Sequence, residues 1–255
     1  MDSAHHLDAL EVAVARMAHT VAEGDPQLPV PTCPGWSLGH LVEHLGCAHL
    51  WAAQSARTAT RPDPYPQQVL NGRTPGQWYA DSGRELVSTL LALDATAPAW
   101  SFARHDRTAG FWRRRQLHET TIHWIDALLA LGQPVPDTPV GTSGDLPGDV
   151  CADGVDEIVT FFLPRGLARA GGAVIAQVVT GPVAVTCTDT SRTWTLTPTD
   201  TDVVVVREAA PADVTVSGRA VDLYLGLWNR ISRAGLTVEG DAQVGATFLA
   251  APLVP

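Results

Sequence analysis

Apolar residues recur at every third or fourth position through the first two thirds of the chain, which predicts a series of amphipathic helices. Ser37 and Thr74 stand where N-caps are needed, and Pro75 suits the first helical position. Gly132, with Pro134 beyond it, provides a stop for the fourth helix. The helices that we expect span residues 4–23, 38–52, 75–91, 111–130 and 150–163.

The pattern changes at residues 164–172 from helical spacing to short runs rich in β-branched residues, separated by turn residues. These runs predict strands at 173–180, 183–188, 193–197, 203–206 and 214–217. Two more helices are expected around 221–231 and 242–250. The fold class is therefore α+β in two domains, a helical bundle over 1–166 and a smaller α+β domain over 167–255.

Composition narrows the possible roles of these domains. Hydrophobic residues make up 45% of the 255 residues and charged residues 17%, which is typical of a compact globular protein. The net charge of −10 argues against nucleic acid or an anionic membrane as the main partner. We see no signal peptide and no membrane-spanning run, and the four cysteines are scattered, so we expect a cytoplasmic location. All 17 basic residues are arginine, which excludes lysine chemistry.

The strongest chemical signal lies in the predicted helix over 111–130, where Glu119 and His123 stand four residues apart. A carboxylate and an imidazole one turn apart can bind one metal ion. His44, on the predicted helix over 38–52, is the best candidate for a third ligand. Three protein ligands leave one position of a tetrahedral ion open, as catalytic zinc sites do.

The spacing has a simpler interpretation that stays open at this point. On a helical wheel the apolar arc of the 111–130 helix lies roughly opposite Glu119 and His123. The two residues would then be an exposed pair that supports the helix by a few tenths of a kcal/mol.

Four other positions have chemical interpretations. His49 lies within an apolar stripe and is expected to be a core histidine hydrogen-bonded to backbone. Cys47 could join the metal site, although a small buried hydrophobic role is more typical. Cys33 could be a nucleophile, but no activating base stands near it in the sequence. Arg113, in the run 113–115, is our candidate for binding a substrate carboxylate, against the usual role of such runs as a solvated face.

Two motifs add a family resemblance. The stretches C-P-G-W-S-L-G-H-L-V-E-H-L-G at 33–46 and H-E-T-T-I-H-W-I-D at 118–126 resemble the mycothiol-dependent maleylpyruvate isomerase family, a branch of the DinB-like metal-binding bundles. Residues 217–230 and 238–242 resemble the second domain of that family. The resemblance implies a DinB-like up-and-down helical bundle followed by a small α+β, sterol-carrier-like domain.

The resemblance also implies a chemistry. The histidine and the E-x-x-x-H pair that bind divalent metal in the family, usually zinc, fall on His44, Glu119 and His123. The implied reaction is activation of a low-molecular-weight thiol, mycothiol, for cis–trans isomerisation of a maleylpyruvate-like substrate or for S-transfer to an electrophile. The partners would be this thiol and a small-molecule substrate, with the protein a monomer or homodimer.

Two other functions remain open at this stage. One is a non-enzymatic small-molecule-binding protein with a structural metal, and the other is a thiol-independent metal hydrolase.

Overall fold

The computed structural model describes residues 1–136, 146–170 and 178–254. The chain forms two compact units, Met1–Val135 and Pro136–Pro255. Helices of residues 148–170 therefore belong to the second unit, whereas the sequence pattern suggested a boundary at 166/167. The helical spacing of that segment did not reveal that it packs with the sheet that follows.

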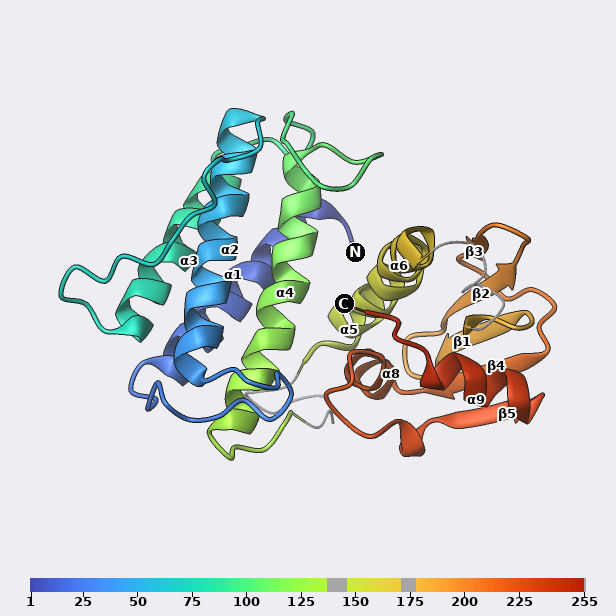
Figure 1. The fold of residues 1–255 in the computed structure, drawn as a ribbon. Coiled ribbons are helices and arrows are strands. Elements are labelled where there is room, and N and C mark those ends of the chain that lie inside the picture. The colour runs from blue at the N-terminus through green and yellow to red at the C-terminus, as the bar shows by residue number, and fades with distance from the viewer. Residues whose placement is uncertain (137–145, 171–177, 255) are drawn as a thin grey trace. The chain divides into compact units, whose positions relative to one another are not determined.

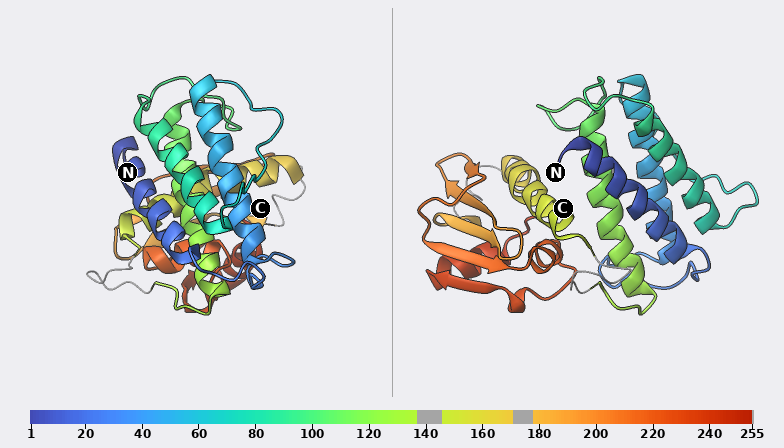
Figure 2. Two further views of the ribbon diagram at one scale, coloured as in Figure 1. Left: turned by 90° about the vertical axis from the view of Figure 1, so that its left-hand side faces the viewer. Right: turned by 180° about the vertical axis from the view of Figure 1, so that it is seen from behind.

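The first unit is a bundle of four helices (Figures 1 and 2). They are α1 (Ser3–Val21), α2 (Leu38–Thr58), α3 (Pro75–Leu91) and α4 (Ala109–Ala130). Ser37 and Thr74 cap α2 and α3, each accepting a hydrogen bond from the backbone N–H three residues later, as predicted. Gly132 has a positive φ of 64°, which suits the stop after α4.

The helix directions correct the expectation of an up-and-down order. Gly46 of α2 lies against Trp78 early in α3, and Arg57 at the end of α2 pairs with Glu85 late in α3, so these two helices are parallel. The connection over 59–74 must return along the length of the bundle, as Figure 1 shows. This segment is rich in proline and too long for a tight turn, which fits its role as a crossover.

The antiparallel pair α2 and α4 positions the candidate site. His44 lies opposite Glu119, while Trp51, two turns further along α2, lies against Trp112, two turns earlier in α4, with ring centroids 5.4 Å apart. Residues from the start of α2 therefore face residues from the second half of α4.

The second unit starts with the helices α5 (Gly148–Glu157) and α6 (Leu163–Ala170), joined by a π-helical turn over Ile158–Phe162. Its sheet has the order β3-β2-β1-β4-β5. The strands are β1 (Val183–Cys187), β2 (Arg192–Pro198), β3 (Val203–Val206), β4 (Val214–Gly218) and β5 (Thr237–Gly240). Among the strands that the structure describes, only β1 and β4 pair in parallel, so the sheet is mixed. Helices α8 (Ala220–Leu227) and α9 (Ala242–Ala250) follow β4 and β5, and this combination of helices and sheet confirms the α+β class.

Four of the five predicted strands match β1 to β4 to within a residue or so at their ends. The fifth expectation, 173–180, falls mostly on residues 171–177, outside the described residues, and 178–180 contain no strand. The strand β5 was not predicted. Its four residues are all exposed, so it has no alternation of buried and exposed positions to detect.

Within the described residues, no helix has the length and apolar character needed to cross a membrane.

Candidate metal centre

A tight turn before α2 lies beside the predicted metal ligands His44 and His123. Trp36 N–H donates to the Cys33 carbonyl at 2.9 Å, and Gly35 has a φ of 84°. Proline followed by a glycine with positive φ is the signature of a type II turn. The sequence Cys33-Pro34-Gly35-Trp36 therefore fixes a loop that holds Cys33 and Trp36 close to the bundle.

The structure brings the three predicted ligands together. His44 Nε2 lies 3.2 Å from Glu119 Oε1, and His123 Nε2 lies 3.5 Å from the same oxygen. One potential ligand atom from each residue lies within 4.8 Å of the others. The exposed fractions of the three side chains are 38% for His44, 23% for Glu119 and 12% for His123. The group is therefore partly buried, yet open to solvent from the His44 side.

These separations fit a bound cation. A tetrahedral ion with ordinary zinc–nitrogen and zinc–oxygen bonds holds its ligand atoms about 3.4 Å apart. Two imidazoles and one carboxylate are also the ligand types of catalytic zinc sites. Donor set and spacing thus agree with a divalent ion of this kind.

The second oxygen of Glu119 is held by Arg115, whose Nη2 donates to Oε2 at 2.7 Å. The Arg115 side chain is only 3% exposed. Burial by itself raises the pKa of the Glu119 carboxyl, but the Arg115 charge and the hydrogen bonds from His123 and His44 outweigh it and hold that pKa well below its usual range. Glu119 is therefore a carboxylate, with Oε1 directed to the two histidines.

His123 is oriented from its other side by Asp126, one turn further along α4. Nδ1–H donates to Asp126 Oδ2 at 2.9 Å, which leaves Nε2 on the side of Glu119. Burial lowers the pKa of His123, but hydrogen bonds to Asp126 and Glu119 outweigh burial and raise it to about 9. Asp126 has 0% exposure, and its Oδ1 accepts a 2.5 Å hydrogen bond from the Thr32 hydroxyl.

An indole closes one side of the group. The Trp36 ring centroid lies 5.0 Å from that of His44 and 6.3 Å from that of His123, and it is stacked at 25° to the latter. The ring limits the rotation of both imidazoles and shields them from water on that side.

The structure explains why the helical wheel suggested a surface pair. The apolar arc of α4 is buried as expected, including Leu117 at 1% and Ile125 at 0% exposure. The opposite face is also covered, because α2 and the loop that holds Thr32 pack over it. A helix buried on both faces does not have one apolar side.

Arg113 is placed differently from the prediction. Its side chain is 8% exposed, and its guanidinium donates to the carbonyls of Ser3, Leu90 and Leu93. These contacts join α4 to the N-terminus of α1 and the C-terminal end of α3. The geometry thus gives Arg113 a structural role and offers no support for binding of a substrate carboxylate.

The structure also places the three other residues for which the sequence suggested a chemical role. His49 is fully buried, as expected, but its Nε2 bonds the Thr120 hydroxyl at 3.0 Å instead of backbone. Cys47 is 4% exposed and lies outside both ligand groups of the described residues, and burial raises the pKa of its thiol to about 11. Cys33 lies beside Asp126, which is far away in sequence.

Sequence reasoning missed the residues that support the three ligands. Arg115 stands four residues before Glu119, and Asp126 three after His123, so helical spacing could have indicated both. Thr32 is 94 residues from Asp126, and no local signal predicts that contact.

Comparisons with known proteins cover both units of the chain. Residues 7–128 match the family model described as the mycothiol maleylpyruvate isomerase N-terminal domain, and residues 149–247 match the MDMPI C-terminal domain. The chain is similar to a crystal structure of the mycothiol-dependent maleylpyruvate isomerase, with 15% identity, a TM-score of 0.62 and 95% of each chain covered. A mutant of that isomerase matches with 14% identity, a TM-score of 0.59 and the same coverage. No functionally curated protein matches the sequence.

Proposed function

Because the chain belongs to the mycothiol-dependent maleylpyruvate isomerase family, a family of enzymes, we propose that it is a metal-dependent isomerase that uses mycothiol or a similar small thiol. The observation that carries the proposal is the convergence of His44 Nε2, Glu119 Oε1 and His123 Nε2 on one point. These three residues would hold a divalent cation, with zinc favoured by the donor set. When bound, the cation would supply Lewis acidity that favours the thiolate form of the thiol.

The residues around the ligands would keep this centre in one geometry. Arg115 fixes the Glu119 carboxylate through Oε2, so that Oε1 faces the histidines. Asp126 holds His123 in the orientation that directs Nε2 into the site. Trp36 restricts both imidazole rings and excludes water from one side.

The reaction that we propose is addition of the thiol sulfur to one carbon of a cis double bond conjugated to a carbonyl. The former double bond then rotates as a single bond, and elimination of the same thiol gives the trans isomer. The thiol is regenerated, so it acts as a cofactor. The substrate class is a maleyl-type dicarboxylate or a related electrophile.

A reducing cytoplasm would suit this chemistry. The four cysteines, Cys33, Cys47, Cys151 and Cys187, form no disulfide with one another in the structure. Free thiols are typical of cytoplasmic proteins, which supports the proposed location.

The first experiment measures zinc content by mass spectrometry in the wild type, in His44→Ala and in His40→Ala. His40 is exposed and stands one turn before His44 on α2, so it is a matched control. We expect one zinc ion per chain in the wild type and in His40→Ala, and loss of the ion in a folded His44→Ala that is purified and measured without excess zinc. Absence of zinc from the wild type after reconstitution would overturn the proposed site.

The second experiment supplies a maleyl-type substrate with and without mycothiol. Isomerisation predicts product formation at constant thiol concentration, whereas S-transfer consumes one thiol for each substrate. Turnover that does not depend on added thiol would instead identify a metal hydrolase. Tight substrate binding without turnover would identify a binding protein.

A further inference from the structure

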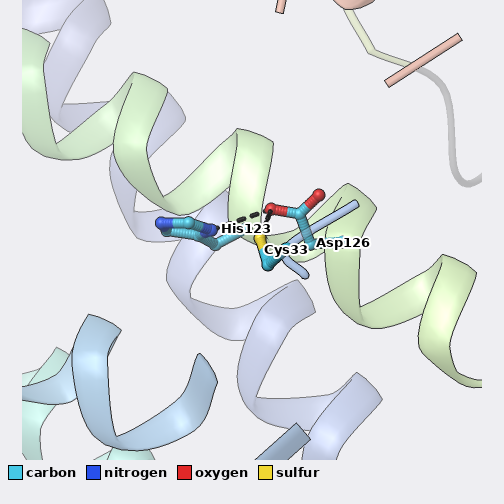
Figure 3. A group of neighbouring side chains, drawn as sticks. All are labelled: Cys33, His123 and Asp126. Atoms are coloured by element: carbon cyan, nitrogen blue, oxygen red, sulfur yellow. Dashed lines mark hydrogen bonds and ion pairs between the residues drawn. The ribbon is translucent and has the colours of Figure 1, made fainter. Parts of the chain in front are cut away.

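A second group of potential ligands meets at Nδ1 of His123, on the side of the ring opposite to Glu119. Asp126 Oδ2 lies 2.9 Å from His123 Nδ1 and 3.6 Å from Cys33 Sγ, and one atom of each residue lies within 4.8 Å of the others. Figure 3 shows the three side chains converging, with Cys33 coming from the turn before α2. We propose that Cys33, Asp126 and His123 form a second site for a thiophilic divalent cation, which shares His123 with the first site.

The separations support this site. A tetrahedral zinc ion holds a sulfur and an oxygen ligand about 3.6 Å apart, and a nitrogen and an oxygen ligand about 3.4 Å apart. The Cys33–Asp126 separation already has the first value, and the His123–Asp126 separation needs to open by about 0.5 Å. Thr32 holds the remaining oxygen of Asp126, so the carboxylate keeps its orientation. Cys33 is half-buried and gives an ion access from solvent.

Sharing His123 makes the two sites mutually exclusive. A neutral imidazole has one in-plane lone pair, and Nδ1–H now donates to Asp126. An ion at Nδ1 displaces this proton, so the ring can keep a proton only on Nε2, where Glu119 Oε1 lies 3.5 Å away and can accept a hydrogen bond from it. Nε2 then has no lone pair for the first site. The Cys33 thiol releases its proton to solvent when the ion binds.

The ligand types differ between the two sites, so the two sites are expected to prefer different metal ions. The first site has two imidazoles and a carboxylate, whereas the second contains a soft thiolate. Soft ligands favour thiophilic ions, such as Cd²⁺ or Zn²⁺ supplied in excess, over harder ions. Such ions would draw His123 away from the first site. The resulting inhibition rests on the proposed function, whereas the existence of the second site does not.

Cobalt absorption in a variant without the first site tests the proposal. His44 belongs to the first group alone, and its side chain is 38% exposed, so His44→Ala is expected to fold. We expect Co²⁺ to give a thiolate-to-cobalt charge-transfer band in metal-free His44→Ala. The band should be lost in His44→Ala/Cys33→Ser and kept in His44→Ala/Cys47→Ser, the matched control. A missing band, or one that survives Cys33→Ser, would overturn the site.

Cadmium titration of the full-length protein with intact His44 gives a second readout. We expect one Cd²⁺ per chain at saturation, with a thiolate absorption that Cys33→Ser abolishes. Two ions bound at once would overturn the mutual exclusion. Neither result depends on isomerase activity, so failure of the second site and failure of the proposed function are distinguishable.

Discussion

Arg115 holds Glu119 by a hydrogen bond of 2.7 Å from Nη2 to Oε2, four residues apart on α4. The arginine is 3% exposed and the glutamate 23%. The pair does two things: it compensates a largely buried negative charge, and it turns Oε1 of Glu119 towards the two histidines. Arg115 is thus a positioning residue for the proposed metal centre.

We predict that Arg115→Met destabilises the metal-free protein by about 3 kcal/mol, the lower end for breaking a buried ion pair, since Glu119 keeps some contact with water. Urea denaturation measures this change. The double variant Arg115→Met/Glu119→Gln should recover part of the loss, because no unpaired carboxylate remains. A double variant no more stable than Arg115→Met would mean that the arginine acts by packing and not by charge.

Asp126 provides a second prediction, which concerns metal affinity. Asp126→Asn removes the carboxylate that fixes the ring orientation of His123, and loss of such a partner weakens metal binding about 10–100-fold. Competition with a chromophoric zinc chelator measures the affinity.

Asp81→Asn is the matched control, since Asp81 pairs with Arg73 and Arg84 at the surface of α3. Equal zinc affinities of Asp126→Asn and the wild type, with both proteins folded, would contradict the assignment.

The limits of prediction from this sequence have identifiable physical causes. Helix ends were predictable where a cap or stop is local, as at Ser37, Thr74 and Gly132. The direction of α3 was not, because the order of helices around a bundle depends on packing such as that between Gly46 and Trp78.

The same holds for the candidate site. The E-x-x-x-H spacing suggested two ligands on one helix, and family resemblance added weight to the third. The contacts of Thr32 and Cys33 with Asp126 join segments more than 90 residues apart, for which a single sequence contains no local signal. The run of arginines was misleading for a related reason. Each step along a helix turns the side chain by about 100°, so Arg113 and Arg115, two positions apart, point to nearly opposite sides and have different environments that composition cannot distinguish.

Arg113 therefore leads to a prediction about stability and not about substrate. Its guanidinium satisfies the carbonyls of Leu90 and Leu93 at the end of α3, where helix carbonyls lack intrahelical partners. We predict that Arg113→Met lowers the free energy of unfolding by about 2–3 kcal/mol and leaves the KM for an anionic substrate unchanged. Thermal unfolding and steady-state kinetics test both parts. A raised KM with unchanged stability would restore the role of Arg113 as a carboxylate-binding residue.

The last prediction concerns acid stability and follows from His49. Its side chain is fully buried, and Nε2–H donates to the Thr120 hydroxyl, which itself donates to the Gln116 carbonyl. Burial lowers the pKa of His49 from its ordinary 6.5 to about 3. Between these values the unfolded chain binds a proton that the folded protein does not, so the folded state loses stability as the pH falls below 6.5.

We expect His49→Gln to remove this loss, because glutamine can donate to Thr120 without titrating. From pH 6 to pH 4 the free energy of unfolding of the wild type should fall relative to the variant by about 1 kcal/mol per pH unit. Above pH 7 the difference should be constant, since His49 is neutral in both states there. Denaturant unfolding across this pH range measures the difference, and parallel curves for the two proteins would show that His49 takes up its proton in the folded state.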